Sequence, residues 1–131
     1  MIEEVKRVLE EMGFKCYVKE GELVVPLRID EDFAEFFVDE EGNAIGIIYD
    51  AERFLSEELM REILRIPTKF KVSIGIDDEG DLIFDAWHVK IKKIPETALG
   101  SFIIFANFVR WLREQSKEGR VEPFRLEEGK R

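Results

Sequence analysis

Three short acidic turns, each containing a glycine, constrain the fold of this chain more than any other feature of its sequence. They lie at 20–23, 41–44 and 79–82 and read EGEL, EGNA and EGDL. Glycine readily reaches the left-handed backbone region that tight hairpin turns require. Each turn therefore predicts a hairpin, with Gly21, Gly42 and Gly80 at positive φ. Hairpins join antiparallel strands, so we expect an antiparallel sheet.

Alternating apolar and polar residues flank these turns, and a period of two is typical of half-buried strands. The pattern predicts strands at about 14–19, 23–29, 33–39, 44–49, 70–76 and 82–91. Pro26 cannot donate a ladder hydrogen bond, so the second strand is expected at a sheet edge or with a bulge. In the last strand the apolar residues change face near Asp85 and Ala86. This change predicts a bulge there, or a sheet covered on both faces.

Three other segments follow the period of a helix. At 2–12 and 55–66 apolar residues recur at helical spacing, and Gly13 and Pro67 are placed to end these helices. A third helix is expected from Pro95 to about Ser116. The order helix, four strands, helix, two strands, helix predicts a two-layer α+β fold. The first and third helices are expected to pack on one face of the antiparallel sheet.

The length and composition indicate one domain with an ordinary core. The chain has 131 residues, of which 45% are hydrophobic and 37% charged. A chain of this length buries enough surface to fold without disulfides or metals. We expect residues 1–116 to form a single domain and residues 117–131 a charged, loosely attached tail. The tail side chains that can pin it are Val121, Phe124 and Leu126.

The charge balance excludes some classes of partner. The formal net charge is −9, and the basic residues are dispersed among acidic ones. Such a surface repels nucleic-acid backbones and anionic lipid, so neither nucleic acid nor membrane is an expected partner. The single cysteine, Cys16, and the charged first segment favour a cytoplasmic location. The scarcity of Asn and Gln beside many charged residues favours a heat-loving source.

The sequence contains no catalytic motif and no convincing metal site. Asp77, Glu79 and Asp81 alternate as in a calcium loop, but Gly80 and the missing bidentate glutamate break the spacing. His88 is the only histidine and has no second histidine to share a metal. Cys16 lies on an apolar strand face and is interpreted as a core residue. We therefore predict no catalytic residues, no metal and no cofactor.

The third helix carries more apolar surface than one sheet face covers. Its apolar residues occupy about 240° of the helical wheel at about 100° per residue, while packing on a sheet uses a stripe of about 100° or somewhat more. Ile104, Phe108 and Trp111 are then left over. Either the first helix or the tail covers them within the chain, or they form an interface. The dimer hypothesis places them at that interface together with Leu59 and Ile63 of the second helix.

A family resemblance enters at residues 68–114, which read TKFKVSIGIDDEGDLIFDAWHVKIKKIPETALGSFIIFANFVRWLRE. A hairpin with an acidic glycine turn, followed by a long apolar helix, resembles the type III secretion chaperone-like fold. Within that fold the chain is most similar to the small YbjN-type proteins. The resemblance implies a twisted antiparallel sheet and, commonly, a homodimer that binds other protein chains. The family usually has three strands before the second helix, whereas four are expected here.

These observations favour a non-enzymatic protein-binding or chaperone-like module. The expected partner is a second copy of the chain, in a homodimer, and possibly another protein chain. The alternative is a small-ligand sensor or minor enzyme with a pocket between the third helix and the sheet. In that alternative Tyr49, Trp87 and His88 supply the polar groups of the pocket. A pocket with polar groups would favour the alternative, and a flat exposed apolar patch would favour protein binding.

Overall fold

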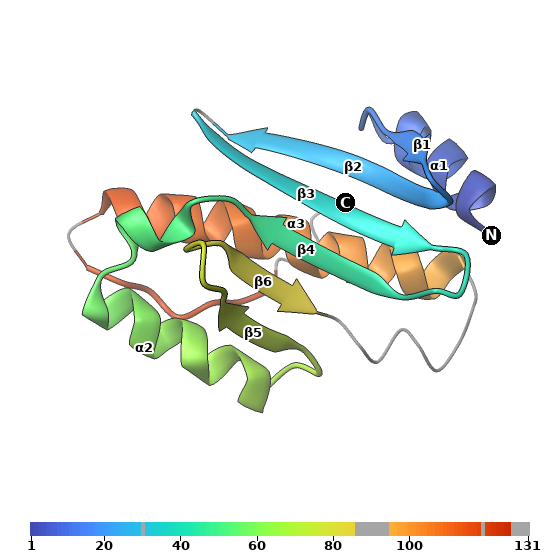
Figure 1. Ribbon diagram of the computed structural model, residues 1–131. Helices are drawn as coiled ribbons and strands as arrows, with labels where there is room; N and C mark the ends of the chain where they lie inside the picture. Colours follow the sequence, from blue (N-terminus) through green and yellow to red (C-terminus); the bar gives the residue numbers. More distant parts are fainter. Residues whose placement is uncertain (30, 86–94, 119, 127–131) are drawn as a thin grey trace.

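The computed structural model describes residues 1–29, 31–85, 95–118 and 120–126 (Figure 1). The chain starts with helix α1, Ile2–Glu11, and continues through strands β1, Tyr17–Lys19, β2, Glu22–Ile29, β3, Asp32–Asp39, and β4, Ala44–Ile48. The 3-10 turn η1, Ala51–Phe54, leads into helix α2, Glu57–Arg65, and the 3-10 turn η2, Ile66–Thr68. Strands β5, Ser73–Ile76, and β6, Leu82–Asp85, precede the long helix α3, Pro95–Lys117.

All six strands form one antiparallel sheet in the order β1-β2-β3-β4-β6-β5. The prediction of an α+β fold with an antiparallel sheet is confirmed. Four strands precede α2, as counted from the sequence, although β1 is short. The first strand was expected from residue 14, but the ladder begins only at Tyr17 because β1 pairs with the three residues Glu22–Val24 alone. The expected bulge near Asp85 and Ala86 lies at the limit of the described residues.

The three glycine turns take the predicted conformation. Gly21, Gly42 and Gly80 have φ of 81°, 86° and 83°. In the first turn Glu20 also has a positive φ of 53°, the pattern of a two-residue type I′ hairpin. The other two turns are longer, and each is organised by an aspartate at its start.

These two longer turns share one hydrogen-bond pattern. Asp39 Oδ1 accepts from the backbone N–H of Glu41 and Asn43, each at 2.9 Å. Asp77 Oδ1 accepts in the same way from the N–H groups of Glu79 and Asp81, each at 3.0 Å. The repeated sequence pattern therefore corresponds to a repeated turn structure.

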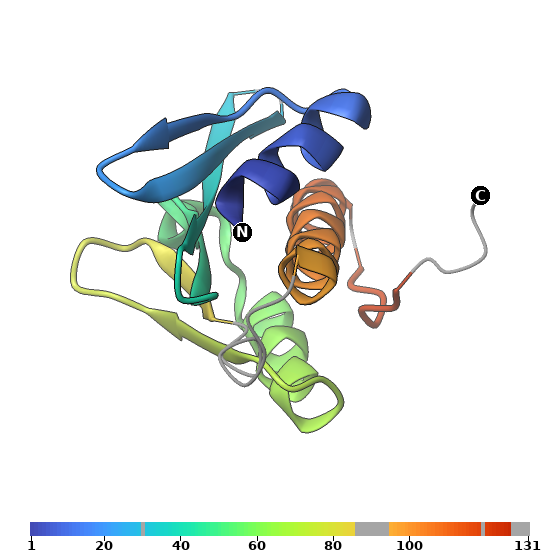
Figure 2. The same cartoon turned by 90° about the vertical axis from the view of Figure 1, so that its right-hand side faces the viewer.

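The helices lie together on one side of the sheet, as Figure 2 shows. Successive side chains of a strand point alternately toward the helices and away from them. β3 and β4 therefore bury every second side chain. The buried core between the layers draws on every helix and on the four strands β2, β3, β4 and β6. It includes Val5, Leu9, Leu23, Val25, Phe36, Val38, Ile48, Leu59, Ile63, Val72, Phe84, Phe102, Phe105 and Phe108.

Pro26 lies where β2 has a neighbour on one side only. It pairs with Glu35 of β3, while β1 ends its pairing with β2 at Val24. Beyond Val24 the other side of β2 has no strand partner among the described residues. The expectation of an edge position for Pro26 is therefore met locally, although β2 is not the outermost strand of the sheet.

The C-terminal segment packs more closely than a loose tail would. Phe124 is buried and its ring contacts those of Phe70, Phe108 and Trp111. Trp111 Nε1 donates to the carbonyl of Glu122 at 2.9 Å. Up to Leu126 this segment belongs to the packed structure, because its one large aromatic side chain completes the core beside α3.

Candidate functional site

The residues proposed for a dimer interface lie inside the chain. Phe108 is fully buried between Phe84, Trp111 and Phe124, and Trp111 is 8% exposed. Ile104 packs against the same core and is half-buried. The C-terminal segment and the sheet thus take up the apolar excess of α3, which is the intramolecular alternative that the sequence left open.

The two residues of α2 assigned to the same interface are buried as well. Leu59 and Ile63 are 1% and 2% exposed and belong to the core. They lie on the face of α2 that points toward the sheet layer, while Leu64 on the opposite face is largely exposed. The basis for a dimer on α3 and α2 is therefore lost, because the side chains concerned already have partners.

The three residues assigned to a ligand pocket do not form one in the described part of the chain. Trp87 and His88 lie outside the described residues. Tyr49 lies on the side of the sheet away from α3, where its ring stacks on Phe33 at 5.5 Å and its hydroxyl donates to Glu35 at 2.7 Å. Burial and this hydrogen bond raise the pKa of Tyr49 far above its ordinary value.

A small cavity does lie between α3 and the sheet, beside Asp32. Leu27, Phe54 and Leu112 are among its lining residues, and its free internal volume is about 10 Å³. That is room for about one water molecule, which is too little for an organic ligand. A shallower hollow of about 210 Å³ lies further along α3, between Phe14 and Val109, and contains none of the predicted pocket residues.

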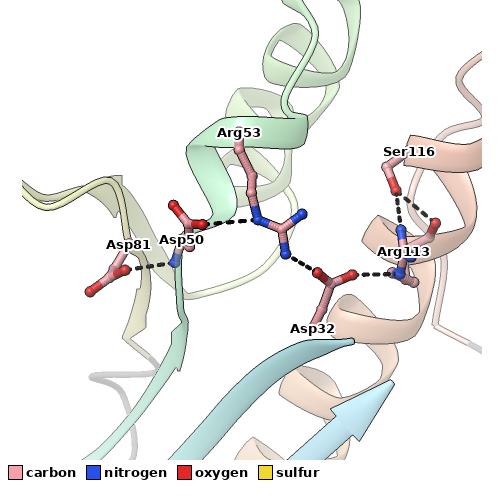
Figure 3. A network of polar contacts seen from close by, with 6 residues as sticks. All are labelled: Asp32, Asp50, Arg53, Asp81, Arg113 and Ser116. Atoms are coloured by element: carbon pink, nitrogen blue, oxygen red, sulfur yellow. Dashed lines mark hydrogen bonds and ion pairs between the residues drawn. The ribbon is translucent and has the colours of Figure 1, made fainter. Parts of the chain in front are cut away.

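Asp32 at this cavity is held by two arginines (Figure 3). Its carboxylate is 8% exposed and contacts the guanidinium of Arg53 from η1 and that of Arg113 from α3, the latter at 2.5 Å. Arg53 also pairs with Asp50 at 3.0 Å. The charge of Asp32 is thus compensated within the protein, as buried carboxylates require. We interpret this network as a structural tie between the sheet and two helical elements.

The face of the sheet that points away from the helices is a surface that sequence reasoning missed. We call it the outer face. Cross-strand pairing brings apolar side chains from five strands and the residue after β4 together on it. These are Tyr17 of β1, Val24 and Pro26 of β2, Phe33 and Phe37 of β3, Ile45 and Ile47 of β4, Ile83 of β6 and Tyr49.

Most of these side chains are half-buried, and Tyr17 is 45% exposed. No helix among the described residues lies over this face, as Figure 2 shows. The signal for it was present in the sequence: both Phe36 and Phe37 are aromatic, so β3 is apolar on both of its faces. Solvent-facing strand positions are usually polar, and this departure marks the outer face as unusual.

Charged groups surround the apolar part of the outer face unevenly. The carboxylates of Glu22, Glu35, Asp39 and Asp85 lie on it, while its cations, Lys19 and Arg28, lie on β1 and β2. Arg28 stacks on the ring of Phe33, with 5.6 Å from its guanidinium carbon to the ring centre. The β4–β6 side of the face is therefore apolar and acidic.

At one end of the outer face lies a concavity of about 180 Å³, which we call the acidic hollow. It is lined by Phe37 and Ile45 together with Glu22, Asp39, Asn43, Ala44 and Asp85. Asp39 is tied into its turn. Its partial burial favours a raised pKa, but hydrogen bonds from the Asn43 side chain and from nearby backbone outweigh it, and the pKa of Asp39 is lowered.

Two other features were tested for chemistry. The ligand atoms of Asp77, Glu79 and Asp81 come within 4.8 Å of one another in the β5–β6 turn, and these residues are exposed or half-buried. Asp77 uses its carboxylate to cap the turn, so the cluster has a structural role. Burial raises the pKa of Cys16, which disfavours a reactive thiolate.

Comparisons with known proteins leave the family open. A scan against protein-family models, a search of curated proteins and a search of solved structures each found no match to this chain. Among the described helices, none combines the length and the apolar character needed to cross a bilayer.

Proposed function

We propose that this chain is a non-enzymatic protein-binding module of the chaperone-like kind, and that it binds through the outer face. The observation that carries the proposal is the set of apolar side chains on that face, which no described helix covers. Contiguous apolar surface with a polar rim is characteristic of interaction sites on soluble proteins. Aromatic side chains such as Phe33, Phe37 and Tyr49 are enriched in protein interfaces.

The charges of the outer face favour another protein over a second copy of the chain as the occupant. A twofold contact between outer faces would set four carboxylates of each copy near one another, with only two cations on each side to compensate. The net charge of −9 adds to this repulsion. We therefore propose a partner segment of another protein, and a homodimer is an outcome that the test distinguishes.

The proposal is tested by selecting binders from a random library of displayed peptides. We expect peptides that bind the wild type and lose binding to an Ile47→Glu variant, because this change puts a charge in the middle of the outer face. Ile103→Glu is the matched control: Ile103 is an isoleucine on α3 that is 45% exposed, and its replacement is expected to leave binding unchanged.

Circular dichroism establishes that both variants are folded before binding is compared. Selection of no specific peptide, or of peptides that bind the Ile47→Glu variant equally well, would contradict the proposal. Sedimentation of the wild type and of the two variants shows whether the chain associates with itself. A dimer that Ile47→Glu dissociates would assign the outer face to a second copy instead.

A further inference from the structure

The acidic hollow combines apolar walls with carboxylates that form no salt bridge with a described residue. Phe37 and Ile45, which face each other across β3 and β4, provide its apolar walls. Glu22 and Asp85 approach it from β2 and β6. Neither carboxylate has a salt-bridge partner among the described residues. By contrast Asp32, which is buried on the sheet face that points toward the helices, has two.

Two of these carboxylates lie directly opposite each other. Glu22 of β2 pairs across the ladder with Asp39 of β3. Like charges at directly opposed positions destabilise a sheet. Hydrogen bonds within its turn hold the Asp39 carboxylate in place. Lys19 of β1, however, lies opposite Glu22 on its other side. The carboxylates of this concave surface that have no cation opposite them in the ladder are therefore those of Asp39 and Asp85, and a cation of a partner would be attracted to them.

We propose that the acidic hollow receives a lysine or arginine side chain of the partner segment, whose neighbouring apolar side chains contact Ile47 and Ile83. This inference rests on the proposed function and specifies its partner as a segment in which basic and apolar residues alternate. An ammonium or guanidinium group above Phe37 gains from the negative face of the ring as well as from the carboxylates. An extended segment presents every second side chain to the same surface, so alternation matches the pleat of the sheet.

The probe for this proposal is a short synthetic peptide of alternating lysine and valine, labelled with a fluorophore. Its affinity is measured by fluorescence anisotropy for the wild type and for a double variant, Glu22→Gln with Asp85→Asn. We expect affinity to fall about tenfold in the double variant, and the salt dependence of binding to become weaker, because two ion pairs are removed.

A matched control separates a defined site from general attraction to an acidic protein. Asp78→Asn with Glu79→Gln removes the same charge from exposed positions in the β5–β6 turn, and we expect its affinity to change less than about twofold. A peptide of alternating glutamate and valine is expected not to bind. Equal loss of affinity in both double variants would overturn the proposal, and so would unchanged affinity in the hollow variant.

The Ile47→Glu variant distinguishes failure of the acidic-hollow proposal from failure of the proposed function. If it abolishes binding while the hollow variant does not, the outer face binds the peptide but the acidic hollow is not the basic subsite. If neither change weakens binding, or if the wild type does not bind the peptide, both the hollow and the outer face are excluded as the site for such a segment.

Discussion

Gly46 lies in the middle of β4 directly beneath the ring of Phe105 from α3. A Cβ built on Gly46 would lie 2.3 Å from Phe105 Cε1, well inside contact distance. The missing side chain therefore lets the helix approach the sheet at this point, which is a known use of glycine within strands. Sequence periodicity groups Ile45, Ile47 and Tyr49 on one strand face, and it does not mark position 46 as one that must remain without a side chain.

We expect Gly46→Ala to destabilise the protein by about 1–3 kcal/mol, because the added methyl group overpacks a closed core. Urea denaturation measures the change. Gly75→Ala is the matched control, since Gly75 is also a strand glycine but a Cβ there meets no atom within 4 Å. Similar free energies of unfolding for the two variants would contradict the close approach of Phe105.

Asp39 gives the protein a pH-dependent contribution to stability. Its folded-state pKa is lowered below the ordinary value of 3.8, chiefly because hydrogen bonds favour the charged form over the effect of burial. A lowered folded pKa contributes stability that is fully present above the ordinary carboxyl pKa. That contribution is lost as the pH falls further, through the folded pKa.

We therefore expect Asp39→Ala to be less stable than the wild type at neutral pH, with the difference shrinking as the pH falls below about 3.8. Urea denaturation at a series of pH values measures it. Asn43→Ala removes the side-chain donor to Asp39, and it is expected to remove part of this pH-dependent contribution to stability. A difference that stays constant down to strongly acid pH would argue against a lowered pKa.

At the scale of elements, the helices follow their sequence patterns closely, whereas β1 and β5 each begin three residues later than the alternation predicts. α1 ends within a residue of its expected end at Met12, and α3 runs from Pro95 to Lys117 as its apolar pattern predicts. The helical period of the apolar residues shows that α3 has a wide apolar surface, but it does not identify which segment covers that surface. The partner of Phe108 could therefore not be predicted. The segment that supplies it, around Phe124, has no period and few apolar residues.

The C-terminal segment should behave as a structural element. We expect Phe124→Ala to lower the free energy of unfolding by about 3 kcal/mol, because a buried aromatic ring is lost from its contacts with α3. Thermal and urea denaturation measure this loss. Arg125→Ala changes the exposed neighbouring residue and is expected to have little effect. Equal stability of both variants would mean that the segment is not packed on α3.

The same packing determines what a charge at position 108 would do. Because Phe108 is fully buried, a Phe108→Glu variant should fail to fold, since the core offers no partner for an isolated carboxylate. Circular dichroism and light scattering show the outcome. If the wild type were a dimer and the Phe108→Glu variant a folded monomer, α3 would instead be the dimer interface.

At the scale of the whole molecule, Asp32 joins elements that are distant in the sequence. It connects the start of β3 with η1 and with the C-terminal half of α3 (Figure 3). Pairs between residues distant in the sequence do not affect local periodicity, so no role was predicted for Asp32. The outer face was missed for a different reason, since the apolar character of both faces of the strand at 33–39 was not considered.

We expect Asp32→Asn to destabilise the protein by about 1–3 kcal/mol, because two arginines lose their charged partner in a largely buried setting. Asp50→Asn is the control, since the Asp50 carboxylate pairs with Arg53 at an exposed position, and its expected cost is below about 1 kcal/mol. Urea denaturation compares the two. An equal cost for both would show that the tie to α3 contributes little.

The two longer turns have the same backbone hydrogen bonds although they lie at opposite ends of the sheet. The backbone solution is therefore shared, but the side chains at the matching positions differ in role. Asp81 accepts the N–H of Asp50 at 2.7 Å, whereas Asn43 donates to Asp39 within its own turn. Independent convergence on one turn chemistry explains this similarity better than a duplication of the chain, because the matching sequence does not extend beyond the turns.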